Sequence, residues 1–178
     1  MAVPEATLER TEFGLVPKGE GWFVVNAKEA RWIEGEAFGS GTVFEGDPKF
    51  KQIGINIGVL QPGQPACLYH REDAQENFLV LFGECLLLVE GEERPLKAWD
   101  FVHCPPWTDH VFVGAGQEPC AILAVGSRER DDIVYPVSEL ARRYGASVEQ
   151  ETPDPKEAYT PFGRPAEAPY RGQLDRAG

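Results

Sequence analysis

The chain has 178 residues, a length that predicts one domain, and 42% of them are hydrophobic, which argues against a mostly disordered polar chain. Its 17 basic and 29 acidic residues give a net charge of −12, so neither nucleic acid nor an anionic membrane surface is an expected partner. No run approaches the ~18 uninterrupted apolar residues of a membrane span, the first residues lack the features of a signal peptide, and four cysteines without a CxxC pair predict reduced thiols in the cytoplasm.

Short apolar runs separated by turn residues predict a series of strands between Trp22 and Gly126. The expected strands are, in chain order, 22–25, 30–34, 42–45, 53–60, 66–72, 76–82, a hairpin over 84–98, 101–104, 110–115 and 120–126. Strand 76–82 is apolar on both parities, which is typical of a central strand covered on both faces. This spacing of strands and turns predicts a sandwich or a barrel.

The C-terminal part is of a different kind. One short helix is expected near 138–145, with Ser138 as its N-cap and Gly145 as its end. From Glu149 the chain is rich in proline and aperiodic, so it is either disordered or, as we expect, laid along the body. We therefore divide the chain into an N-terminal extension (1–20), a barrel (21–130) and a C-terminal helix with a Pro-rich tail packed on the body (131–178).

Histidine and glutamate residues form the candidate site. Strand parity places His70 and Glu72 on one face of 66–72, with Cys67 on the opposite face. Glu76 opens the next predicted strand, and His110 opens a later one. Imidazole and carboxylate groups that converge inside a closed β-structure are suited to binding a metal ion, because a buried carboxylate needs a compensating cation.

Two segments resemble the motifs of the cupin superfamily. The run His70-Arg71-Glu72, three residues, Glu76, six residues, Gly83 is similar to the first motif. The run Trp99, five residues, Pro105-Pro106-Trp107, two residues, His110, three residues, Gly114 is similar to the second. The resemblance covers about residues 55–126 and implies an all-β fold, a double-stranded β-helix or jelly-roll barrel.

The departures from these motifs affect both the turns and the ligands. Trp99 and Trp107 stand where cupins have glycine, and Gly114 stands where they have asparagine. Glu72 stands where cupins usually place a second ligating histidine. Trp107 is expected to be a packing residue or a lid over the pocket.

The resemblance implies a divalent first-row transition metal on His70, Glu76 and His110, with Glu72 assigned to the site by position only. Glu72 is a ligand, a hydrogen-bond partner of a ligating histidine, or a general base, and it is the one candidate catalytic residue. Carboxylate oxygen favours iron or manganese, while zinc or nickel is also possible. His103 is at none of the defining positions of the two motifs and is expected to be a core or supporting residue.

Two classes of function follow from the resemblance. The first is a metal-dependent enzyme, an oxidoreductase of dioxygenase type or a decarboxylase or isomerase, acting on a small polar organic molecule inside the barrel. The second is a non-catalytic module that binds a metal or a small ligand. We also expect a homodimer, because strand 76–82 is apolar on both faces and the N-terminal tryptophans require burial.

Overall fold

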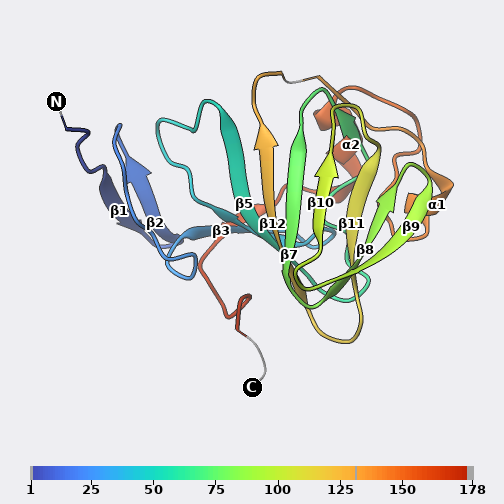
Figure 1. Cartoon of the computed structure of the whole chain (residues 1–178), viewed down its shortest axis with the longest axis horizontal. Coiled ribbons are helices and arrows are strands. Elements are labelled where there is room, and N and C mark those ends of the chain that lie inside the picture. Colours follow the sequence, from blue (N-terminus) through green and yellow to red (C-terminus); the bar gives the residue numbers. More distant parts are fainter. Residues whose placement is uncertain (1, 131, 176–178) are drawn as a thin grey trace.

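Two antiparallel sheets form the body of the protein (Figure 1). The computed structural model describes residues 2–130 and 132–175. The larger sheet contains, in spatial order, β10 (Phe101–Cys104), β7 (Glu76–Phe82), β12 (Cys120–Ser127), β5 (Ile53–Leu60), β4 (Ser40–Val43), β3 (Arg31–Glu34) and β14 (Ala166–Ala168). The smaller sheet contains β11 (His110–Ala115), β8 (Glu84–Val89) and β9 (Glu92–Lys97).

The remaining elements are short. Strands β1 (Thr7–Thr11) and β2 (Gly14–Lys18) form a hairpin that stands to one side of the body in Figure 1. Strand β6 (Arg71–Glu72) pairs with β13 (Ile133–Val134). The helical segments are α1 (Glu139–Arg142), α2 (Pro155–Tyr159) and the 3-10 turn η1 (Thr160–Phe162). Within the described residues, no helix is long and apolar enough to cross a bilayer.

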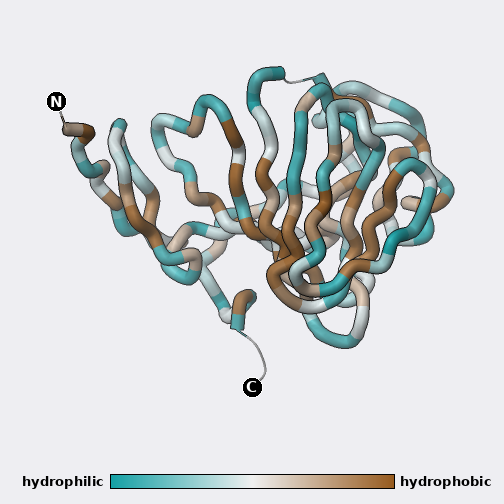
Figure 2. The backbone as a smooth tube through the Cα atoms, viewed as in Figure 1, coloured by the Kyte–Doolittle hydropathy of each residue, from teal (hydrophilic) through white to brown (hydrophobic). Residues whose placement is uncertain are grey.

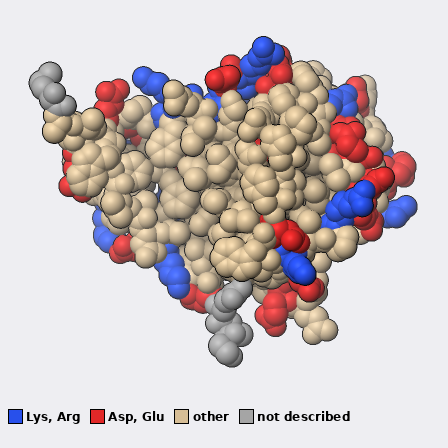
Figure 3. Space-filling model, viewed as in Figure 1, with Lys and Arg blue, Asp and Glu red and all other residues tan. Residues whose placement is uncertain are grey.

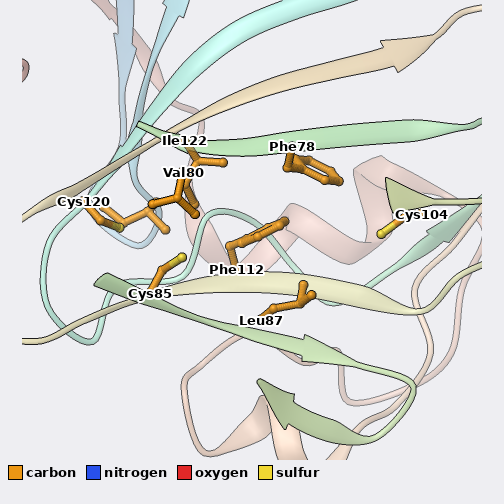
Figure 4. Packing of buried hydrophobic residues seen from close by; sticks show 9 residues of the cluster. Phe78, Val80, Cys85, Leu87, Cys104, Phe112, Cys120 and Ile122 are labelled. Atoms are coloured by element: carbon orange, nitrogen blue, oxygen red, sulfur yellow. The ribbon is translucent and has the colours of Figure 1, made fainter. Parts of the chain in front are cut away.

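The main core lies between the two sheets. Phe78 and Ile122 of the larger sheet point toward Leu87 and Phe112 of the smaller one (Figure 4), and the Phe78 and Phe112 ring centroids are 4.7 Å apart. Hydrophobic stretches are concentrated in these strands, whereas many of the connections are hydrophilic (Figure 2). The predicted all-β double-stranded β-helix is therefore confirmed.

Most strand predictions agree with the structure. Strands 53–60, 76–82, 101–104 and 110–115 have the expected bounds. Two expectations are wrong. Residues 22–25 form no strand beyond a single bridge at Trp22, and 66–72 bends at its start, so only Arg71–Glu72 is a strand.

The C-terminal segment packs on the body where the structure describes it. The Ser138 side chain caps α1 by accepting a hydrogen bond from the Ala141 N–H, as predicted, although the helix is shorter than 138–145. Strand β14 pairs with β3, and Tyr170 lies 5.8 Å, centroid to centroid, from the fully buried Trp32. A second helix, α2, was not expected. The four cysteines are free, and all except Cys67 are buried.

The substituted motif positions keep unusual backbone conformations. Trp99 and Trp107 have φ of +75° and +68°, a region in which glycine is favoured; the Trp99 side chain is largely exposed and that of Trp107 is half-exposed. At Gly114 the need is spatial, because an added Cβ would collide with the carbonyl oxygen of Gln61. The turns therefore retain glycine-like geometry even where the side chain has changed.

We expect Gly114→Ala to lower the free energy of unfolding by about 1–3 kcal/mol, because the Gln61 backbone must move to accept the methyl group. Gly41→Ala is the matched control, since its nearest contact would be the Ile57 oxygen at 3.9 Å. We expect the control to be neutral or slightly stabilising. Equal effects in urea unfolding of the two variants would contradict this account of Gly114.

Candidate metal centre

An antiparallel backbone pair brings the two histidines together. The N–H of His70 donates to the carbonyl of His110 at 3.2 Å, and the N–H of His110 donates to the carbonyl of His70 at 2.8 Å. Directly opposed residues of an antiparallel pair project their side chains from the same face. The two imidazole centroids are accordingly 4.9 Å apart.

Backbone carbonyls determine which nitrogen of each imidazole carries a proton. Nδ1 of His70 lies 2.8 Å from the Leu68 carbonyl oxygen, and Nδ1 of His110 lies 3.0 Å from that of Thr108. A carbonyl only accepts hydrogen bonds, so both Nδ1 atoms are donors. In the neutral rings, both Nε2 atoms therefore present a lone pair, as in histidines that bind a metal.

Glu76 completes the group from the larger sheet. It is the first residue of β7, on the same parity as the buried Phe78 and Val80. Its Oε2 lies 3.2 Å from Nε2 of His110, and with that nitrogen unprotonated this buried oxygen has no hydrogen-bond partner. One ligand atom from each of His70, Glu76 and His110 lies within 4.8 Å of the other two. A cation among them would satisfy all three lone pairs, so these residues fit a metal ion.

The electrostatics of the group also favour a cation. Burial lowers the pKa of His70, and the neighbouring His110 lowers it further. Burial opposes charge on His110 too, but its contact with Glu76 outweighs this and raises the pKa of His110. Burial alone would raise the pKa of Glu76, but its contacts with His110, His70 and Glu72 together lower it. The group thus combines a carboxylate with a neutral His70.

Glu72 lies beside this group without belonging to it. Its carbonyl accepts a hydrogen bond from the Trp107 N–H at 2.7 Å, and its side chain is near enough to Glu76 to contribute to the lowered pKa of that carboxyl. Glu72 is therefore a neighbour of the three convergent ligand atoms through Glu76.

Aromatic rings surround the two histidines. Phe78 lies 5.4 Å from His110 and Tyr135 lies 6.0 Å from His70, measured between ring centroids. The site opens into a cavity of about 300 Å³ lined mainly by apolar side chains of both sheets. A cavity of this size is at the lower end of the range for small-molecule sites.

Three other residues differ from their expected positions. The bends at 66–67 break the alternation of a strand, so Cys67 lies on the side of His70 instead of opposite it, with Sγ 3.7 Å from Nδ1. Burial raises the pKa of the Cys67 thiol to about 12. His103 is exposed and contacts Asn77 instead of lying in the core. Trp107 is half-exposed and lies outside the residues that line the cavity.

The family profile described as the cupin domain matches residues 56–126. No curated protein sequence matches the chain. A polyketide cyclase from Streptomyces resistomycificus superposes with a TM-score of 0.55 at 17% identity, covering 63% of this chain and 83% of that one. A predicted oxalate decarboxylase from Thermotoga maritima superposes with a TM-score of 0.53 at 21% identity, covering 59% of this chain and 98% of that one. These two likenesses establish the fold alone.

A candidate sugar phosphate isomerase from Acidithiobacillus ferrooxidans is 29% identical, with a TM-score of 0.43 and coverage of 47% of this chain and 54% of that one. The chain thus spans about half the length of that relative. The profile match contains Glu76 and His110 in addition to the strands that carry them. Residues 56–126 therefore form a cupin domain.

Proposed function

We propose that the protein is a metal-dependent oxidoreductase that holds a divalent first-row transition metal on His70, Glu76 and His110. The observation that carries the proposal is the buried Glu76 Oε2, which lacks a hydrogen-bond partner and faces two imidazoles whose Nδ1 protons are already engaged. A buried carboxylate oxygen without a partner is costly unless a cation compensates it.

The donor set favours iron or manganese over copper. Two imidazoles and one carboxylate form the ligand set of non-haem iron oxygenases, and carboxylate is a hard ligand; zinc and nickel remain compatible. When bound, such a metal would supply redox or Lewis-acid chemistry at coordination positions that the protein leaves open.

The residues around the site have roles in proton transfer and in the exclusion of water. Glu72 holds or moves a proton beside Glu76 and is the candidate catalytic residue. Phe78, Phe112 and Tyr135 exclude water from the imidazoles. The substrate is a small polar organic molecule that enters the 300 Å³ cavity. The four free thiols are in keeping with a reducing compartment, and we propose the cytoplasm.

We also propose that two copies associate through the outer face of the larger sheet. Over β5, β12, β7 and β10 this face is largely free of charged side chains (Figure 3), although the chain has a net charge of −12. Phe101 is 65% exposed on β10, which is the edge strand of that sheet. A two-fold contact is self-complementary, so a second copy can cover the same apolar surface on each subunit.

The metal proposal predicts that His110→Ala lowers the affinity for the metal ion by more than 100-fold. The reason is that removal of a residue that only supports a ligand already costs roughly 10–100-fold. The protein would be treated with chelator and titrated with Mn(II) and Fe(II) under anaerobic conditions. His103→Ala is the matched control, since it removes an exposed histidine of β10, the strand that pairs with the Glu76 strand β7. We expect the control to bind one metal ion with unchanged affinity. Unchanged affinity in His110→Ala would contradict the site.

We expect Glu72→Gln to keep one bound metal ion with its affinity reduced by about 10–100-fold, the cost of changing a residue that supports a ligand. Gln retains a hydrogen-bonding group but has no exchangeable carboxyl proton, so turnover should be lost. The Fe(II)-loaded wild type should consume oxygen with at least one of a panel of small hydroxy and keto acids, and the metal-saturated variant should not. Metal-saturated wild type without turnover on the panel, whether oxidation, decarboxylation or isomerisation, would instead favour the non-catalytic binding module.

The dimer predicts a mass of twice 19.7 kDa by light scattering. Phe101→Glu should shift this mass to that of the monomer, because a charge would be buried in an apolar contact. Lys97→Glu changes the charge on β9 of the other sheet and should leave the dimer intact. A monomeric wild type at micromolar concentration would refute the association.

A further inference from the structure

A second cavity of about 700 Å³ lies between the C-terminal segment and the connection that precedes β4. One wall is formed by α2 and η1, and the other by residues 35–39. Ile33, Gly39, Ala66 and Cys67 line both this cavity and the smaller one that contains His70, Glu76 and His110. The larger cavity, the antechamber, therefore adjoins the candidate metal centre.

The walls of the antechamber are aromatic. The Phe38 ring lies 5.4 Å from Tyr159 and 5.0 Å from Phe162, centroid to centroid, in edge-on and tilted arrangements. Tyr159 and Phe162 are in turn 6.4 Å apart. Such a cluster presents ring faces and edges suited to an apolar, flat molecule.

The charged residues of the antechamber are all of one sign. Among the described residues, Lys156 and Arg164 are the charged side chains that line it, and both are exposed. Neither forms an ion pair with a described residue, whereas most other arginines of the chain do. Two unpaired cations at one opening of a protein with a net charge of −12 point to an anionic group on the ligand.

A single residue links the antechamber to the candidate metal centre. The N–H of Leu68 donates to the Tyr159 hydroxyl at 3.1 Å, while the carbonyl of Leu68 accepts the Nδ1–H of His70 at 2.8 Å. The aromatic wall and a proposed metal ligand are thus held by the same peptide segment. A molecule seated against Tyr159 therefore lies beside the wall that the two cavities share.

We propose that the antechamber binds an aromatic carboxylate, with its rings against Phe38 and Phe162 and its anionic group at Lys156 and Arg164. The opposite end of the molecule reaches the smaller cavity through the opening at Ala66 and Cys67. Its assignment as the substrate rests on the proposed function, but the binding itself does not require a metal. The proposal narrows the substrate from a small polar organic molecule to an aromatic acid.

Two fluorescent probes with similar ring systems test the proposal on metal-free protein kept in chelator. 8-Anilinonaphthalene-1-sulfonate carries an anionic group, and N-phenyl-1-naphthylamine lacks it. We expect the anionic probe to bind at one site and more tightly than the neutral one, with a difference that shrinks as salt is raised from 0.05 to 0.5 M. Equal affinity of the two probes, or no saturable binding of the anionic one, would overturn the proposal.

Substitutions locate the binding site. The double variant Lys156→Gln/Arg164→Gln should weaken the anionic probe by about three- to tenfold, the range expected for two exposed charge pairs, and leave the neutral probe unchanged. Lys49→Gln/Lys51→Gln removes the same charge from exposed lysines that do not line the antechamber and should change neither probe. Phe162→Ala should weaken both.

The pattern of results separates this proposal from the metal proposal. If Lys156→Gln/Arg164→Gln and the control Lys49→Gln/Lys51→Gln lose the same affinity for the anionic probe, net charge and not the antechamber attracts the anion. That result would refute the antechamber proposal. Metal stoichiometry measured on the same variants should stay at one ion per chain. In the wild-type protein, absence of saturable probe binding with the metal retained would mean that the antechamber proposal has failed, whereas absence of metal binding with probe binding retained would mean that the metal proposal has failed.

Discussion

The structure depends on one constraint, the burial of the Glu76 carboxylate beside two imidazoles whose Nδ1–H groups already donate to backbone carbonyls. The antiparallel pair of His70 and His110 places both rings on one face, and the carbonyls of Leu68 and Thr108 orient them. Without a cation, the buried carboxylate oxygen either faces the lone pairs of two neutral imidazoles or draws a proton onto His110, whose pKa it raises. A cation turns the same three groups into a site in which every lone pair has a partner, which is why we place a metal there.

The scaffold keeps the turns that this arrangement needs despite an altered sequence. Trp99 and Trp107 adopt the positive φ that glycine adopts at little cost, and the Trp107 N–H donates to the carbonyl of Glu72. The backbone hydrogen bond joins the turn before His110 to the strand that carries Glu72. Gly114, in contrast, is required by the close approach of the Gln61 carbonyl. Trp99, Trp107 and Gly114 thus occupy backbone positions at which a glycine is favoured by φ or by space, whichever residue is present.

The sequence predicted correctly the strands that have a clear local periodicity. It did not predict the positions of side chains that depend on tertiary contacts. Strand 76–82 and strand 110–115 have the expected bounds because their apolar pattern is buried between the sheets. Cys67 was placed on the wrong side, since alternation holds only for a regular strand and the chain bends at 66–67. His103 was expected to be a core or supporting residue but is exposed, because it lies on the edge strand β10 whose outer face is uncovered. Strand β14 has no local signal, and its pairing with β3 forms it. Helix α2 does begin with a local signal that the sequence analysis missed, because Asp154 caps it by accepting a hydrogen bond from the Lys156 N–H and Pro155 is its first residue. Ala158 then packs with Leu68 and Tyr135.

The central claim is that His70, Glu76 and His110 bind one ion, and anomalous diffraction from crystals grown with Mn(II) tests it most directly. We predict a single anomalous peak within about 2.0–2.3 Å of both Nε2 atoms and of a Glu76 carboxylate oxygen, distances typical of nitrogen and oxygen ligands to a divalent metal. The two Nδ1 atoms should keep their carbonyl partners in that structure. An anomalous map without a peak at this position, or an ordered water in hydrogen-bond contact with Glu76 Oε2 in its place, would contradict the account.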